Sequence, residues 1–196
     1  MAAASMILVQ SVVTAAPAEI DADWLDLWSD TVSVVIFLVS IGGITFLWFT
    51  GVIRELIGDR EDRFFATIYF GSAIILVVLT FMWAATLGAM FNAFTLASDM
   101  LVNNDIFIFG FAMMNQIVDN FALRVAGVYM ISIGTVWTRA AVTPRWLTLA
   151  TFLVAIGFLF FAGAFRGARF IFPAWVFLVS VYILVVNYQR ADPEIS

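Results

Sequence analysis

The sequence predicts an all-α integral membrane protein: a bundle of five transmembrane helices preceded by a short N-terminal apolar segment. Of its 196 residues, 64% are hydrophobic and 12% are charged. A soluble domain is about 45–50% apolar and about 25% charged, so this composition is not that of a soluble domain. The mean hydropathy is +1.05. The apolar residues also come in runs of about 18 or more, the length that crosses a bilayer.

Residues 1–30 form the first predicted region. Residues 1–18 are mildly apolar and end in a small-x-small pattern, which is typical of a signal-peptidase site, but no basic region precedes it. Three outcomes stay open for this segment: cleavage, an interfacial helix, or a sixth span. Residues 19–30 carry five acidic groups and no arginine. Trp24 and Trp28 lie one helical turn apart there and are predicted anchors at the membrane interface.

The helical membrane domain is predicted over residues 31–189, with a polar tail over 190–196. The third span is too long for one upright crossing, because its roughly 32 residues would make a helix of about 48 Å. Pro173 is expected in the first turn of the last span, where its missing N–H costs little. The five predicted spans cover residues 31–53, 64–87, 106–137, 146–165 and 170–188.

The arginines predict the orientation. The loop 54–63 holds three arginines, the loop 138–145 holds two and the C-terminal tail holds one, whereas the loop 88–105 holds none. The positive-inside rule therefore predicts a multi-pass protein of the cell membrane, with its acidic N-terminal segment outside and its C-terminus in the cytoplasm. Arg166 and Arg169 fall outside and break this pattern. They are candidate contacts for lipid headgroup phosphates.

A polar cluster on the third span is the candidate site for an ion or a partner. It consists of Asn115, Gln116, Asp119, Asn120 and Arg124. On a helix, Asn115 and Asp119 lie within about 40° of each other. The same spacing places Gln116 beside Asn120. Arg124 lies about 140° from Asp119, so the two cannot form an ion pair along one straight helix.

Three interpretations of this cluster remain open, because a half-polar helix cannot face lipid on its polar side. In the first, the cluster lies near the outer surface, Arg124 snorkels, and residues 106–114 tilt, lie in the interface or pack on another helix. In the second, residues 106–137 form a discontinuous helix whose break creates an ion or substrate site. In the third, the polar face is buried against a partner protein.

Small residues mark two packing positions. Gly163 and Gly167 have the spacing that lets helices approach closely, which indicates either a tight helical hairpin or a dimer seam. Gly127, Ile131 and Gly134 form a flat strip on the third span, as expected of helix packing.

The sequence contains no His, no Cys and no Lys. It therefore has no disulfide, thiolate zinc site, haem-ligating His, Schiff-base lysine or Walker phosphate loop. We expect no catalytic, cofactor-binding or metal-binding residues, no enzymatic activity and no nucleic-acid partner. Arginine without lysine is also typical of GC-rich codon usage and indicates a prokaryotic source.

Two functions are consistent with these features. The first is a non-catalytic membrane protein acting by association, as an accessory subunit of a membrane complex or as a homo-oligomer. Small loops and a large apolar surface favour it, with the lipid bilayer and other membrane subunits as partners. The alternative is a small channel or transporter whose path is lined by the polar cluster of the third span.

Overall fold

The computed structural model describes residues 22–57, 63–96, 104–140, 143–164 and 167–191, and every regular element within them is a helix. Residues 1–18, whose fate the sequence leaves open, lie outside the described residues. The elements in chain order are α2 (Ala22–Ile57), α3 (Arg63–Leu96), α4 (Asn104–Gln116), the π-helix η2 (Ile117–Ala122), α5 (Leu123–Ala140), α6 (Arg145–Phe161) and α7 (Ala168–Ala191).

Within the described residues, four helical segments are long and apolar enough to cross a bilayer, namely Leu27–Glu55, Phe64–Ala93, Asp105–Thr138 and Ala168–Val186. The predicted span 146–165 corresponds to α6, which has only 17 residues. The predicted helical membrane protein is thus compatible with the structure, but the count of five spans is not confirmed.

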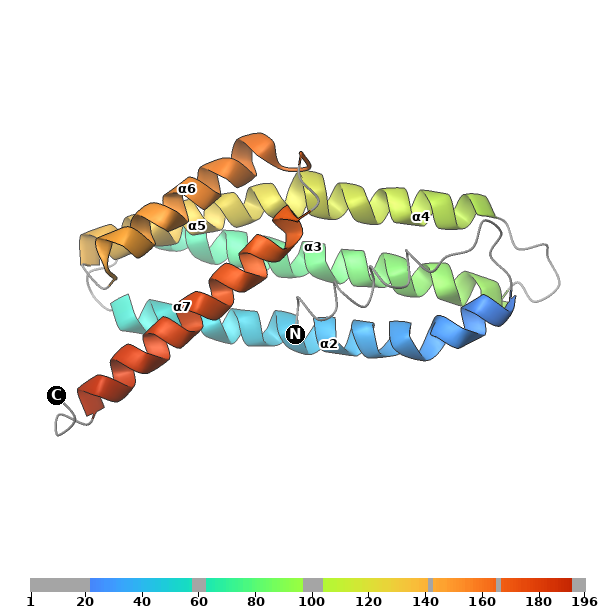
Figure 1. Ribbon diagram of the computed structural model, residues 1–196, viewed down its shortest axis with the longest axis horizontal. Coiled ribbons are helices and arrows are strands. Elements are labelled where there is room, and N and C mark those ends of the chain that lie inside the picture. The colour runs from blue at the N-terminus through green and yellow to red at the C-terminus, as the bar shows by residue number, and fades with distance from the viewer. Residues whose placement is uncertain (1–21, 58–62, 97–103, 141–142, 165–166, 192–196) are drawn as a thin grey trace.

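Three long helical rods run side by side: α2, α3, and the continuous rod formed by α4, η2 and α5 (Figure 1). With 36 and 34 residues, α2 and α3 are about 54 and 51 Å long. The shorter helices α6 and α7 cover only one half of these rods (Figure 1). We call residues 22–39, residues 83–96 and α4 the distal half, and the remainder the proximal half.

Each half has its own apolar core. In the proximal half, Tyr69, Tyr129 and Ile133 are fully buried, and Trp175 of α7 packs against them. In the distal half, Val35, Leu87 and Phe107 bring α2, α3 and α4 together without α6 or α7. The apolar segment 106–114 therefore packs on another helix, one of the outcomes considered for it.

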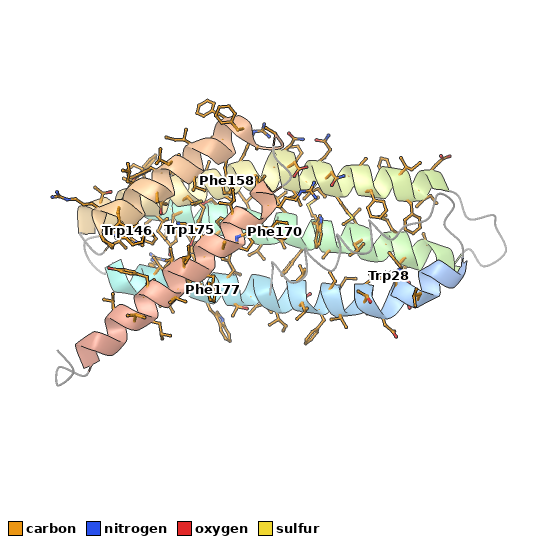
Figure 2. The ribbon with its side chains drawn as sticks, in the orientation of Figure 1. Trp28, Trp146, Phe158, Phe170, Trp175 and Phe177 are labelled. Atoms are coloured by element: carbon orange, nitrogen blue, oxygen red, sulfur yellow. The ribbon has the colours of Figure 1, made fainter. Side chains whose placement is uncertain are left out.

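Four helix termini that carry arginine meet at one end of the bundle. Arg54 lies in the last turn of α2, Arg63 begins α3, Arg139 lies in the last turn of α5 and Arg145 begins α6. These termini lie together at the proximal end, which we call the arginine end (Figure 1). Figure 2 shows Trp146 near this end and Trp28 near the opposite one.

The second predicted span is longer than expected. Its helix was predicted to end near residue 87, but α3 continues to Leu96. Met90 and Phe91 explain the difference, because both are buried in the distal core. Burial against α2 and α4 extends the helix through a segment that looks polar enough to leave the membrane.

The turn between α6 and α7 also differs from its predicted position. The fourth span was expected to reach residue 165, but α6 ends at Phe161 because Ala162 leaves the helical region and Gly163 has a φ of +82°. Glycine tolerates this left-handed conformation. A turn joins the two helices here, but they diverge toward the arginine end, so the tight hairpin expected from the small residues is not formed (Figure 1). Trp175 Nε1 links them by donating to Thr151 Oγ1 at 2.9 Å.

Pro173 does not lie in the first turn of α7. The helix begins at Ala168, two residues before the predicted start, so Pro173 occupies the second turn. A proline ring has no N–H, and the carbonyl of Arg169 therefore lacks its usual helical partner.

The predicted strip of small residues packs α5 against α6. A Cβ atom at Gly127 would lie 2.9 Å from the backbone oxygen of Ala155, and one at Gly134 would lie 3.2 Å from the ring of Phe152. At Gly157 of α6, by contrast, a Cβ atom would have no neighbour within 4 Å.

We expect Gly127→Ala to destabilise the protein by about 1–3 kcal/mol, the usual cost of overpacking, because the new methyl group meets backbone. The matched control is Gly157→Ala, which has free space and should gain up to about 1 kcal/mol from its lower backbone entropy in the unfolded chain. The measurement is the free energy of unfolding during an SDS titration in mixed micelles. Equal effects of the two substitutions would contradict the packing described here.

Candidate functional site

The predicted polar cluster meets the last helix where α4 becomes η2. Arg169, near the start of α7, donates from Nε to Asp119 Oδ1 at 2.8 Å and from Nη2 to Asp119 Oδ2 at 2.7 Å. Its Nη2 also donates to Asn115 Oδ1 at 2.8 Å. The Arg169 and Asp119 side chains are each 23% exposed. The result is a two-pronged, partly buried ion pair, the stronger geometry for arginine and carboxylate.

The π-helix η2 keeps the buried apolar residues of α4 and those of α5 on the same side of the rod. Met114 and Val118 are buried, but the next buried position is Leu123, five residues after Val118. The N–H of Leu123 donates to the carbonyl of Val118, the i→i−5 pattern of a π-helix. An uninterrupted α-helix would have turned Phe121, which is exposed, toward the core. The wider turn thus absorbs a shift of one residue in the apolar pattern.

The other polar side chains form a separate row along η2 and α5. Asn120 Nδ2 donates to Gln116 Oε1. Arg124 Nη1 donates to the backbone oxygen of Asn120 and, at 3.1 Å, to its Oδ1. The structure thus confirms that Asn115 shares a face with Asp119 and that Gln116 shares a face with Asn120. Arg124 bonds to Asn120 and not to Asp119.

Of the three interpretations of the cluster, the discontinuous helix over residues 106–137 is wrong for the described residues. One apolar helical segment runs from Asp105 to Thr138, and η2 widens the rod without ending it. Because backbone hydrogen bonding continues through η2, this rod contributes no helix end to a site at this position.

The α6–α7 turn lies over the ion pair. A Cβ atom at Gly163 would lie 3.6 Å from the Cβ of Asp119. The turn therefore packs directly on Asp119, and it brings the start of α7, with Arg169, to the same place. The positive φ of Gly163 favours glycine at this position.

A cavity of about 530 Å³ extends from Arg169 between α2, α3, the η2–α5 rod and α7. Its walls are mainly apolar, with Trp83, Val118 and Phe172 among the residues that line it. No group of three or more His, Cys, Asp or Glu side chains that could hold a metal ion occurs in the part of the chain that the structure describes.

The remaining predicted site residues have different outcomes. Trp28 is half-buried and packs against the distal core. Trp24 belongs to α2, but its side chain lies outside the described residues, as does Arg166. The lipid contacts predicted for Arg166 and Arg169 stay predictions.

Sequence reasoning missed Arg169 as the partner of Asp119, because it compared Asp119 only with Arg124 on the same helix. A signal was available. Arg169 is one of two arginines that break the positive-inside pattern, and Asp119 is an acid inside an apolar segment. Opposite charges of this kind in two spans tend to pair.

Comparisons of the chain with protein-family models, with curated proteins and with solved structures found no match. The function is therefore argued from the geometry of the chain itself.

We expect Arg169→Gln to lower the free energy of unfolding by about 1.5–3 kcal/mol, because it removes hydrogen bonds to a charged group. The double variant Asp119→Asn with Arg169→Gln should lose less than the sum of the single variants, with a coupling of about 0.5–3 kcal/mol. The measurement is an SDS titration of the wild type, both single variants and the double variant.

Arg124→Gln provides the matched control for this cycle. Arg124 is not bonded to Asp119, so its coupling to Asp119→Asn should stay within about 0.5 kcal/mol. An equal or larger coupling for Arg124 would contradict the assignment of Arg169 as the partner.

Proposed function

We propose that this chain is a non-catalytic integral membrane protein that acts as an accessory subunit, by association with another membrane protein. The observation that carries the proposal is a mismatch of length between two packed helices. The helix α6 has 17 residues and is about 26 Å long. The apolar segment Asp105–Thr138, on which it packs, has 34 residues and is about 51 Å long.

No single tilt fits both helices to a hydrocarbon layer of about 30 Å. Transmembrane helices tilt by roughly 0–40°, and at 40° the longer segment still crosses about 39 Å, whereas α6 crosses only about 20 Å. A bilayer matched to α6 extends from the arginine end to the level of the ion pair. The distal half then lies outside the hydrocarbon. By the positive-inside rule, the arginine end faces the cytoplasm and the distal half lies on the outer side of the cell membrane.

The surface of the distal half supports this position. Asp30, Asn92 and Asp105 are exposed on it, and such side chains suit water better than lipid. Apolar side chains are nevertheless exposed on it as well, including Leu27, Val34 and Phe37 of α2. On α4, Ile106, Phe109 and Met113 are exposed on one face of the helix, which we call the α4 face. A contiguous apolar face on a wet surface is typical of a protein–protein contact.

The charges of the distal half favour a different protein as the partner over a second copy of this chain. The sequence has no basic residue from 1 to 53 or from 64 to 123, whereas Asp30 and Asp105 are exposed there. A two-fold contact through the α4 face would bring acidic surfaces together, which costs affinity. An apolar partner surface with a basic rim fits both features.

The channel or transporter has one observation in its favour, because π-turns inside helices are frequent at functional sites. The polar groups around η2 are, however, bonded to one another, and the neighbouring cavity has mainly apolar walls. This function therefore ranks second. Its test is solute flux into liposomes that contain the purified protein, with Asp119→Asn as the variant.

We expect a photo-reactive benzoyl-phenylalanine in place of Phe109 to form covalent adducts with protein in the native membrane. Phe109, on the α4 face, is 70% exposed. The matched control is the same replacement at Phe177, which is 67% exposed on α7 in the proximal half. The variant at Phe177 should give lipid adducts only. The measurement is mass spectrometry of the adducts after irradiation.

An adduct between Phe109 and a protein other than this chain supports the accessory subunit. An adduct of twice the mass of the chain replaces it with a homo-oligomer. Lipid adducts alone at both positions would show that the distal half lies in the bilayer, and the proposal would then fail.

A further inference from the structure

We propose that the cavity beside Arg169 is a lipid site, which takes one acyl chain of a membrane phospholipid and holds its phosphate on the Arg169 side chain. The cavity volume of about 530 Å³ falls within the range of about 300–1,000 Å³ that is typical of small-molecule sites. Its wall consists of residues from four helical rods, and three of them (α2, α3 and α7) also expose apolar side chains to the surroundings.

The cavity wall is mainly apolar in composition, and its few hydroxyl groups already donate hydrogen bonds within their own helices. Three hydroxyl groups belong to lining residues, but each donates within its own helix. Thr45 donates to the carbonyl of Ile41, Thr80 to Leu76 and Ser180 to Val176. Apart from Trp83, whose indole carries one N–H, Arg169 is then the lining side chain with donors to spare, so the cavity has a charged group at one end and mainly hydrocarbon walls along the rest.

The length of the cavity suits one leaflet of a bilayer. Along α7 its lining runs from Arg169 to Ser180, a rise of about 17 Å, and along α2 from Val39 to Phe49, about 15 Å. One leaflet contributes about half of the roughly 30 Å hydrocarbon layer. Both helices run toward the arginine end, so the cavity extends from Arg169 toward the middle of a bilayer matched to α6 (Figure 1). Arg169 then lies at the depth of the lipid phosphates.

Arg169 retains donors for a phosphate. Its Nε and Nη2 donate to Asp119 and Asn115, whereas its Nη1 has no acceptor among the described residues. The two N–H groups of Nη1 are therefore the donors that remain for a phosphate oxygen. Because Asp119 neutralises the charge of Arg169, the site recognises the phosphate group that all phospholipids share, and the net charge of the headgroup matters less.

This inference uses the bilayer position of the proposed function, but its test is independent of the α4 face. The full-length protein is purified in detergent and stripped of lipid, and palmitoyl-oleoyl phosphatidylglycerol is then added. Native mass spectrometry counts the bound lipids, and the thermal midpoint of unfolding is measured with and without lipid.

The variant Ser180→Phe fills the cavity from α7, and its neighbour Val181→Phe adds the same ring on the exposed side, outside the cavity. We expect the wild type and Val181→Phe to bind one lipid and to gain thermal stability from it. Ser180→Phe should bind the lipid at least tenfold more weakly and gain nothing. Arg169→Lys, which keeps the charge but has a single nitrogen to serve both Asp119 and the phosphate, should bind it severalfold more weakly. If Ser180→Phe does not fold, Ala122→Leu fills the cavity from η2 instead.

Equal lipid binding by the wild type and by the cavity-filling variant would overturn the proposal. A rise in thermal stability of the same size with glycerol phosphate alone would also overturn it, because an anion site at Arg169 would then act without the acyl chain. A Phe109 adduct with a protein partner is not affected by either result, so the two proposals fail separately.

Discussion

The ion pair between Asp119 and Arg169 is the contact on which the arrangement of the last two helices depends. It ties the start of α7 to η2, and it sits directly beneath the α6–α7 turn at Gly163. Without it, a carboxylate and a guanidinium would lie partly buried beside apolar side chains, an expensive state for either group. Because the pair satisfies both, the start of α7 stays at η2 and α7 closes one side of the cavity. One non-local contact therefore positions the turn, the cavity and the polar end of that cavity.

The sequence predicted what local geometry decides. The helical periodicity placed Asn115 beside Asp119 and Gln116 beside Asn120, and it separated Arg124 from Asp119, all as the structure shows. It did not predict the partner of Asp119, because Arg169 is 50 residues away and meets it only through the fold. The π-turn was not predicted for a related reason. Its sign is a step of five residues between buried positions, which can be recognised only once it is known which residues are buried.

Helix ends show the same division between local and tertiary causes. The end of α6 follows from local conformation at Ala162 and Gly163, although composition alone placed it later, at residue 165. The end of α3 does not follow from local conformation. Leu96 lies beyond the apolar run, and the helix continues to it because Met90 and Phe91 are buried. Tertiary packing routinely overrides local propensity in this way. The two separate cores also result from tertiary packing. The rods α2, α3 and α4–η2–α5 contribute to both cores, whereas α6 and α7 contribute only to the proximal core.

The position of the ion pair along the chain has a consequence for biogenesis. Asp119 is synthesised 50 residues before Arg169, which belongs to α7. Until α7 has emerged, the carboxylate and Asn115 lack the guanidinium. The docking of α7 and the neutralisation of Asp119 are therefore a single late event. A nascent chain that stops short of α7 leaves both polar side chains without their partner, which distinguishes it from a chain that has reached α7.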